Sequence, residues 1–219
     1  SGVVLRRCLG EDSVYESWLA ESIEPGRIPR PQLLRRLRAE RATDPRLCDE
    51  VRTRAKRASA LEHPSILRIT ELAPDSESTG YCADLSDGKS LQQLLCLTSK
   101  AGHALPIWFG LEVARQLTRA LEYAHERLDD QGRPLGASHG DVSPENIVIT
   151  VQGLVKLTDF GLSPCALGAT TTGGESKQTA IEGTVVLPAG LDWESEQASD
   201  LKQVGSTLYR LLTGHAPAS

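Results

Sequence analysis

Three polar side chains flank one predicted hairpin in this sequence. Asp141 and Asn146 precede the apolar run 147–149, and Asp159 follows a second apolar run, 154–157. A Gln-Gly pair lies between the two runs, so the chain reverses there and brings all three side chains to one place. Carboxylate and amide oxygens gathered in this way suit magnesium-assisted transfer of a phosphoryl group. Either half of the pattern alone is a weak signal, because a single solvated turn explains it.

The two halves of the pattern are His139-Gly140-Asp141-Val142-Ser143-Pro144-Glu145-Asn146 and Asp159-Phe160-Gly161. Placed on either side of a hairpin, they resemble the catalytic core of eukaryotic-type protein kinases. The resemblance implies that Asp141 orients the attacking hydroxyl, and that Asn146 and Asp159 hold Mg²⁺ against the phosphates of ATP. Small-molecule phosphotransferases share the His-x-Asp and the Asn, but they usually lack Asp-Phe-Gly.

The resemblance extends over nearly the whole chain and is to bacterial Ser/Thr kinases of the PknB-like family. Residues 9–15 look like the loop that covers the nucleotide, and residues 61–64 look like the His-Pro that follows the family's αC helix. Residues 81–90 look like the fifth strand and the hinge, and residues 199–214 look like the αF helix. The nucleotide contacts that this implies are Ala83 at the gatekeeper position, Asp84 and Leu85.

The family implies an α+β, two-lobed fold with a β-rich N-lobe, a helical C-lobe and ATP in the crevice between them. We expect an N-lobe of strands plus the αC-like helix over residues 1–85, and a partial helical C-lobe with both motifs over residues 86–219. The family continues with three more helices beyond the αF-like one. A truncated chain or a minimal lobe would explain the difference, and the C-lobe end would then be exposed or covered by another domain or subunit.

Hydrophobic spacing and capping residues predict the elements. Asp44 as a cap, with Pro45 at the first helical position, predicts a helix to about Leu61. Helical spacing also predicts helices over 106–127 and 199–212. Short strands are expected at 3–5, 14–19, 32–37, 66–72 and 81–85. The segment 162–183 is rich in Ser, Thr, Gly and Ala, and we expect a mobile loop there.

Four departures from the family pattern bear on activity, and two of them lie near the phosphates. The nucleotide-covering loop keeps only Gly10, and Glu11 and Asp12 would add negative charge there. Three glycines would let backbone N–H groups approach a phosphate closely. Aligning residues 32–35 with the family's Val-Ala-x-Lys places Arg35 at the Lys position, where its planar fork is not an equivalent donor.

The other two departures affect the αC helix and the catalytic loop. Counting back from the His-Pro places Arg54 where the αC Glu belongs, so a Lys–Glu pair would become two like charges. Glu50, one turn earlier, would partly substitute, and a slip in the alignment would leave both arginines facing solvent. Gly140 replaces the Arg that anchors a phosphorylated activation loop. Ser143 replaces the Lys that steadies the transferring phosphoryl group.

These departures favour a pseudokinase, a kinase fold retained for a regulatory or scaffolding role in signalling, with weak or absent binding of ATP and Mg²⁺. The alternative is an active bacterial Ser/Thr kinase that transfers the ATP γ-phosphate with atypical N-lobe residues. A third hypothesis is that the chain is a protein-interaction module that binds no nucleotide. All three imply protein partners or substrates.

Composition further limits the classes of protein and of partner that fit this sequence. The 219 residues, 39% of them hydrophobic, can bury one substantial domain or two small lobes. A net charge of −5 argues against a nucleic-acid partner, although arginines are dense over 27–57. The five cysteines form no CxxC pair, which indicates a reducing, cytoplasmic compartment. No apolar run is long enough to span a bilayer.

Overall fold

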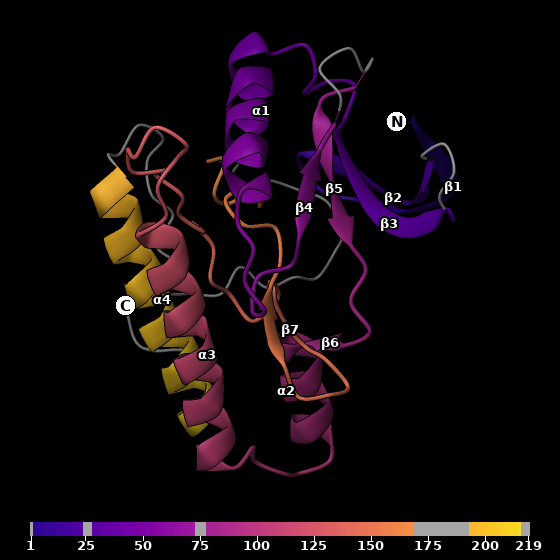
Figure 1. The fold of residues 1–219 in the computed structure, drawn as a ribbon. Coiled ribbons are helices and arrows are strands. Elements are labelled where there is room, and N and C mark those ends of the chain that lie inside the picture. The colour runs from indigo at the N-terminus through magenta and orange to yellow at the C-terminus, as the bar shows by residue number, and fades with distance from the viewer. Residues whose placement is uncertain (1, 24–27, 73–77, 169–192, 216–219) are drawn as a thin grey trace. The chain divides into compact units, whose positions relative to one another are not determined.

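The computed structural model describes residues 2–23, 28–72, 78–168 and 193–215. The chain divides into two compact units. The N-terminal unit comprises Ser1–Glu62 and Arg68–Leu85, and the C-terminal unit comprises His63–Leu67 and Ser86–Ser219. In the described residues, a five-stranded sheet and helix α1 make up the first unit, while a three-stranded sheet and helices α2 to α4 make up the second (Figure 1).

The sheet of the N-terminal unit has the strand order β1-β2-β3-β5-β4, and every neighbouring pair is antiparallel. Its strands are β1 (Gly2–Glu11), β2 (Tyr15–Ile23), β3 (Arg30–Leu37), β4 (Ile69–Glu71) and β5 (Gly80–Asp84). Ala20, Leu34 and Cys82 come from three of these strands and form a buried cluster, against which Trp18 and Leu72 pack. Apolar side chains therefore bury this face of the sheet.

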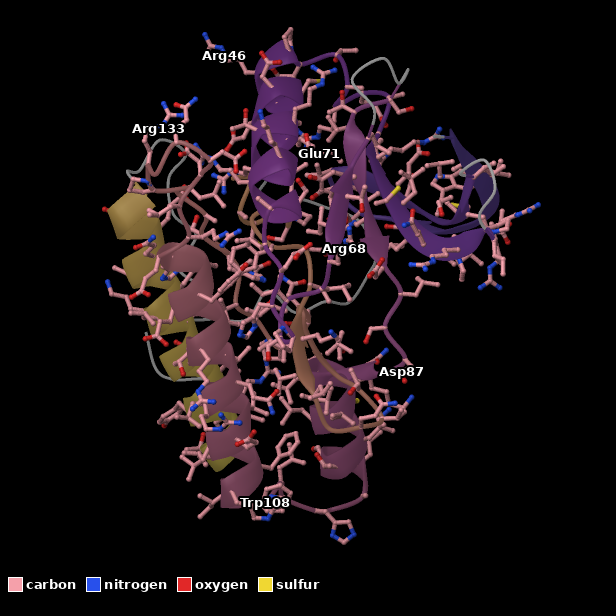
Figure 2. The ribbon with its side chains drawn as sticks, viewed as in Figure 1. Arg46, Arg68, Glu71, Asp87, Trp108 and Arg133 are labelled. Carbon is pink, nitrogen blue, oxygen red and sulfur yellow. The ribbon has the colours of Figure 1, made fainter. Side chains whose placement is uncertain are left out.

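Helix α1 (Pro45–Ser59) begins as the sequence predicts. The Asp44 side chain accepts hydrogen bonds from the backbone of Arg46 and Leu47, and proline occupies the first turn. The helix packs against β4, where the Ser59 hydroxyl donates to Glu71 at 3.0 Å; Figure 2 labels Glu71 beside α1. Its buried residues are Cys48, Val51, Ala55 and Ala58, which recur every three or four positions.

The small sheet of the C-terminal unit contains the hairpin predicted from residues 147–157. Strands β7 (Ile147–Ile149) and β8 (Val155–Leu157) are antiparallel, and β6 (Lys89–Ser90) pairs with β7. Helix α2 (Leu91–Lys100) follows β6 directly. It starts with a capping box, in which Ser90 accepts from the Gln93 backbone and Gln93 accepts from the Ser90 backbone.

Helices α3 (Ile107–His125) and α4 (Trp193–Thr213) lie side by side (Figure 1). Gly110 allows this approach, because a Cβ there would lie 3.3 Å from the Leu212 side chain. Trp108 lies in the first turn of α3, and 68% of it is exposed (Figure 2). Helix α4 begins earlier than the predicted start at Ser199. No described helix is long and apolar enough to cross a membrane.

The predicted strand over 66–72 is longer than the observed one. Only Ile69–Glu71 forms β4, in the N-terminal unit. Ile66 instead makes an isolated parallel bridge to Leu157, and the Leu67 N–H donates to the Leu157 carbonyl at 2.8 Å. The alternating pattern marks extended backbone correctly, but it does not indicate that the two halves pair with different sheets.

Candidate functional site

Arg35 lies within the N-terminal unit and has three close partners there. Its side chain, 9% exposed, forms an ion pair with the Asp12 carboxylate. Its Nη1 also donates to the Tyr81 hydroxyl at 3.4 Å, and its guanidinium lies 4.8 Å from the centre of the Tyr15 ring. Strand pairing explains this grouping, because Arg35 on β3 is directly opposite Tyr81 on β5.

Asp12 forms the turn between β1 and β2. Its Oδ1 accepts hydrogen bonds from the backbone N–H groups of Val14 and Tyr15, both at 2.8 Å, while its Oδ2 pairs with Arg35. One carboxylate therefore binds both the cation of β3 and two backbone donors of the turn. Arg38 also donates a hydrogen bond to the Asp12 carbonyl at 3.1 Å. This side chain of β3's neighbouring segment therefore helps to stabilise the turn.

Gly10, the one glycine retained from the family's loop, is not in this turn. It belongs to β1, where it is paired with Ser17 beside a shift in strand register, and its φ is +146°. That backbone conformation is one that only glycine adopts readily. Gly10 therefore shapes a bulge in the strand, whereas the residues of the turn itself are Asp12, Ser13 and Val14.

Arg54, at the predicted αC Glu position, donates to Glu50 at 3.0 Å along α1. Its side chain is 17% exposed. Since the Arg35 side chain is also largely buried, neither arginine points into solvent, contrary to the alternative in which both face it. Glu50, which the sequence offered as a substitute acid, is engaged by Arg54.

The predicted hinge residues occupy β5 and the position after it. Ala83 is buried and is paired with Leu33 on one side and Ile69 on the other. Asp84 is exposed, and its backbone N–H donates to the Arg68 carbonyl at 3.0 Å. Leu85 follows the strand and is 47% exposed.

In the C-terminal unit, α4 holds the loop that contains Asp141. The Asp200 carboxylate accepts the backbone N–H groups of His139 at 2.8 Å and Gly140 at 2.7 Å. One turn further on, Gln203 accepts the Val142 N–H at 2.6 Å. These bonds satisfy the donors of a buried loop and fix its path.

Asp141 and Asn146 contact each other directly. The Asn146 Nδ2 donates to the Asp141 Oδ2 at 2.7 Å and to the Asp141 carbonyl at 3.1 Å. Ser143 contributes through its backbone, since its carbonyl accepts the Asn146 N–H at 3.0 Å. Asn146 is tied in turn to Thr158, whose N–H donates to the Asn146 carbonyl at 2.9 Å. The hairpin thus places the Asn next to the residue that precedes Asp159.

The Asp-Phe-Gly segment is joined to the same loop. His139 is within 2.9 Å of the Thr158 carbonyl and meets the Phe160 ring edge to face, with centroids 5.0 Å apart. The Gly161 N–H donates to the His139 carbonyl at 3.1 Å. Asp159 has φ +53°, the one positive value at a non-glycine residue in the described chain. Such backbone strain is concentrated at functional sites.

Sequence reasoning missed two residues at these loops, Asp12 as a partner of Arg35 and Cys165 as a neighbour of Asp141. Burial, followed by the negative charges of Asp141 and Glu145, raises the pKa of the Cys165 thiol to about 11. An Asp-Ser turn does signal side-chain capping, but nothing in the sequence near Cys165 points to Asp141.

The segment predicted as a mobile loop, 162–183, is described only up to residue 168. This described part is a closed turn, in which the Ser163 hydroxyl accepts the Ala166 N–H at 3.1 Å and the Ser163 carbonyl accepts the Leu167 N–H at 3.1 Å. Residues 169–183 lie outside the described chain.

The fold and these loops are those of a protein kinase domain. Residues 34–219 match the family model described as the protein kinase domain, and the chain belongs to that family. It is 29% identical to the tyrosine-protein kinase MasK of Myxococcus xanthus, over 99% of this chain and 33% of that protein. It is also 29% identical to the serine/threonine-protein kinase PknB of Mycobacterium leprae, over 95% and 32%. The chain thus spans about a third of the length of these relatives.

Solved structures agree with this assignment. The kinase domain of Mycobacterium tuberculosis PknI superimposes with a TM-score of 0.68 and 25% identity, over 100% of this chain and 75% of that one. The predicted fold class is therefore confirmed, with the β-sheet unit as the N-lobe and the helical unit as the C-lobe. Protein kinases generally use ATP and Mg²⁺.

Proposed function

We propose that this chain is a pseudokinase domain, with weak or no binding of ATP and a regulatory or scaffolding role toward protein partners. One observation carries the proposal. The Asp12 carboxylate binds Arg35 and the backbone N–H groups of Val14 and Tyr15. Kinases use a strand cation and a backbone-lined loop to hold ATP phosphates, and here a carboxylate of the chain itself binds the corresponding groups.

An ATP phosphate would compete with this carboxylate at a disadvantage. Asp12 belongs to the same unit as Arg35, so its effective concentration at the cation is high. Displacing it would strip two backbone donors of their acceptor and leave a second negative charge beside the phosphate. Since the Arg35 side chain is only 9% exposed, loss of its partner without an equally good replacement is unfavourable.

The magnesium side of the site retains suitable donors. Asp159 and Asn146 would hold the ion, because carboxylate and amide oxygens are the ligands that Mg²⁺ prefers. The Asn146 amide nitrogen faces Asp141, which leaves its oxygen as the metal-binding atom. In the described residues no group of three or more His, Cys, Asp or Glu could hold a metal alone. Bound phosphate oxygens and water would have to complete the coordination.

An active kinase is the second candidate, and the ordered catalytic loop favours it. Asp141 and Asn146 are joined at 2.7 Å, and Asp200 fixes the backbone on the N-terminal side of Asp141. Arg35 would then stand in for Lys. The names of the relatives include both a tyrosine kinase and a serine/threonine kinase, so an active chain would phosphorylate one of these acceptor types. The third candidate function is that of a protein-interaction module that binds no nucleotide.

Protein partners and a cytoplasmic location complete the proposal. The five cysteines all have free thiols, which suits a reducing compartment. The net charge of −5 gives no support for binding nucleic acid.

Titration calorimetry with ATP, with and without Mg²⁺, tests the proposal. We expect no measurable heat from the unaltered chain at micromolar ATP. Asp12→Asn should gain Mg²⁺-dependent binding, because the amide still caps the turn but no longer neutralises Arg35. Glu11→Gln is the matched control, since it removes one charge from a neighbouring residue that is 61% exposed. Tight Mg²⁺-dependent binding by the unaltered chain would refute the proposal.

A further inference from the structure

Residues 63–67, which we name the 63–67 segment, belong to the C-terminal unit, although the chain on either side of them belongs to the N-terminal unit. The segment is bound to strand β8 through its backbone. The Leu157 N–H donates to the Ser65 carbonyl at 2.9 Å, and the Leu67 N–H donates to the Leu157 carbonyl at 2.8 Å. These two bonds fix the segment beside the hairpin.

His63 closes a turn at the start of the 63–67 segment. Its Nδ1 accepts the Ser65 backbone N–H at 3.1 Å, and its carbonyl accepts the Ile66 N–H at 3.0 Å. Its ring stacks on the Tyr123 ring of α3, with centroids 5.2 Å apart and planes 30° apart. A ring nitrogen that accepts a backbone N–H carries no proton, so this turn requires the neutral form of His63.

The charged groups around the His63 ring disfavour its protonation. Lys156 on β8 is held near it, because the Lys156 Nζ donates to the Pro64 carbonyl at 2.9 Å. Arg127 on α3 lies 5.9 Å from the centre of the aromatic ring on which His63 stacks. Glu62, its neighbour along the chain, is exposed. Partial burial, followed by the charge of Lys156, lowers the pKa of His63 from the ordinary 6.5.

We propose that His63 is a pH-sensitive switch, which holds the 63–67 segment on β8 when its ring is neutral and releases the segment when its ring is protonated. Protonation would turn the acceptor nitrogen into a donor that faces the Ser65 N–H, and it would add a positive charge near Lys156. Since the chain continues into the N-terminal unit at both ends of the segment, release would lengthen the tether between the two units. The switch operates whether or not the chain binds nucleotide.

The sign of the pH dependence follows from the lowered pKa of His63. The bound segment takes up the proton less readily than the released segment does. The bound state is therefore fully favoured well above pH 6.5, and it becomes less stable as pH falls through 6.5 toward the pKa of the folded ring.

Hydrogen exchange measured by NMR between pH 7 and pH 5 tests the switch. The Leu67 and Leu157 amides report on the bound segment. The Thr150 N–H, which donates to the Leu154 carbonyl at 2.9 Å in the same hairpin, is the reference. Relative to this reference, we expect the protection of both amides to fall severalfold, and by at most about tenfold per pH unit, because one proton is bound. The His63 ring signal should titrate below pH 6.5.

Three variants identify the group that responds to pH. In His63→Asn the side-chain oxygen can still accept the Ser65 N–H but does not titrate, so the pH dependence should disappear. His103→Asn, at an exposed histidine before α3, is the matched control and should leave the pH dependence unchanged. Lys156→Gln keeps an N–H donor for the Pro64 carbonyl but removes the charge, so the His63 ring should titrate at a higher pH than in the unaltered chain.

Three results would overturn the inference. The first is protection of Leu67 and Leu157 that stays constant relative to Thr150 from pH 7 to pH 5. The second is an equal fall in His63→Asn, which would assign the response to a different group. The third is a His63 ring that titrates at or above pH 6.5 in the unaltered chain, a result that decides the matter even if circular dichroism shows His63→Asn to be unfolded.

Discussion

Asp200 and His139 are 61 positions apart in the sequence, and the Asp200 carboxylate accepts the His139 backbone N–H at 2.8 Å. The same carboxylate accepts the Gly140 N–H and contacts His125 at 2.9 Å, and it is fully buried. We expect Asp200→Ala to reduce the free energy of unfolding by about 3 kcal/mol, because three polar groups lose their partner. Urea denaturation measures this, with exposed Lys202→Ala as the control. A loss under about 0.5 kcal/mol would contradict it.

Arg35→Lys tests whether the strand cation alone limits nucleotide binding. We expect the single variant to bind ATP no better than the unaltered chain, since Asp12 can pair with a lysine as well. The double variant Asp12→Asn/Arg35→Lys should bind more tightly than either single one. Calorimetry with ATP and Mg²⁺ provides the measurement. Tight binding by Arg35→Lys alone would show that Asp12 is not the competitor.

Phosphoryl transfer should be negligible in the unaltered chain, whether assayed as autophosphorylation or with generic substrates and radiolabelled ATP. Transfer depends on positioning and charge stabilisation, and the sequence predicts arginines, Arg35 and Arg54, at both positions of the family's Lys–Glu pair. If the chain transfers phosphate and Asp141→Asn abolishes the transfer, the pseudokinase proposal fails.

The reversion Arg35→Lys/Arg54→Glu should gain little activity on its own. Arg54→Glu would place two carboxylates at positions 50 and 54 of α1, one turn apart, where Arg54 now pairs with Glu50. Like charges at this spacing destabilise a helix by about 0.2–0.5 kcal/mol. Adding Glu50→Gln removes the repulsion, so the triple variant should outperform the double one in the same assay. Equal activities would show that Glu50 plays no part.

Stability should fall at alkaline pH through Cys82. Burial raises the pKa of this thiol to about 11 from an ordinary 9.0. The folded state therefore keeps a proton that the unfolded chain loses, so the contribution is complete below pH 9 and disappears as pH rises toward 11 and above. Cys82→Ala should flatten the fall in unfolding free energy between pH 9 and 11. An unchanged slope would mean that Cys82 does not titrate on unfolding.

Capping residues and short apolar runs predict those parts of the fold that depend on residues close in sequence. The Asp44 cap and Pro45 fix the start of α1, and the paired apolar runs fix the hairpin that joins Asn146 to the segment before Asp159. Both depend on residues close in sequence. The motifs therefore predict that Asp141, Asn146 and Asp159 lie on adjoining loops.

The remaining contacts depend on register and on partners distant in sequence. Asp12 reaches Arg35 only because β1, β2 and β3 pair in one particular register. Ala166 can lie against position 140 only because Gly140 has no side chain, since a Cβ there would lie 2.9 Å from the Ala166 Cβ. Neither relationship produces a periodic pattern or a motif, so composition and spacing could not reveal them.

Strand β1 is an edge strand of the five-stranded sheet. It is ten residues long and has several exposed apolar side chains, features that would let a strand from another molecule pair with it. The register shifts between Leu5 and Arg7 and between Cys8 and Gly10 interrupt its regular ladder. A bulged edge twists and cannot pair continuously with a straight strand from another molecule. These irregularities should therefore protect the chain against polymerising through its sheet at high concentration.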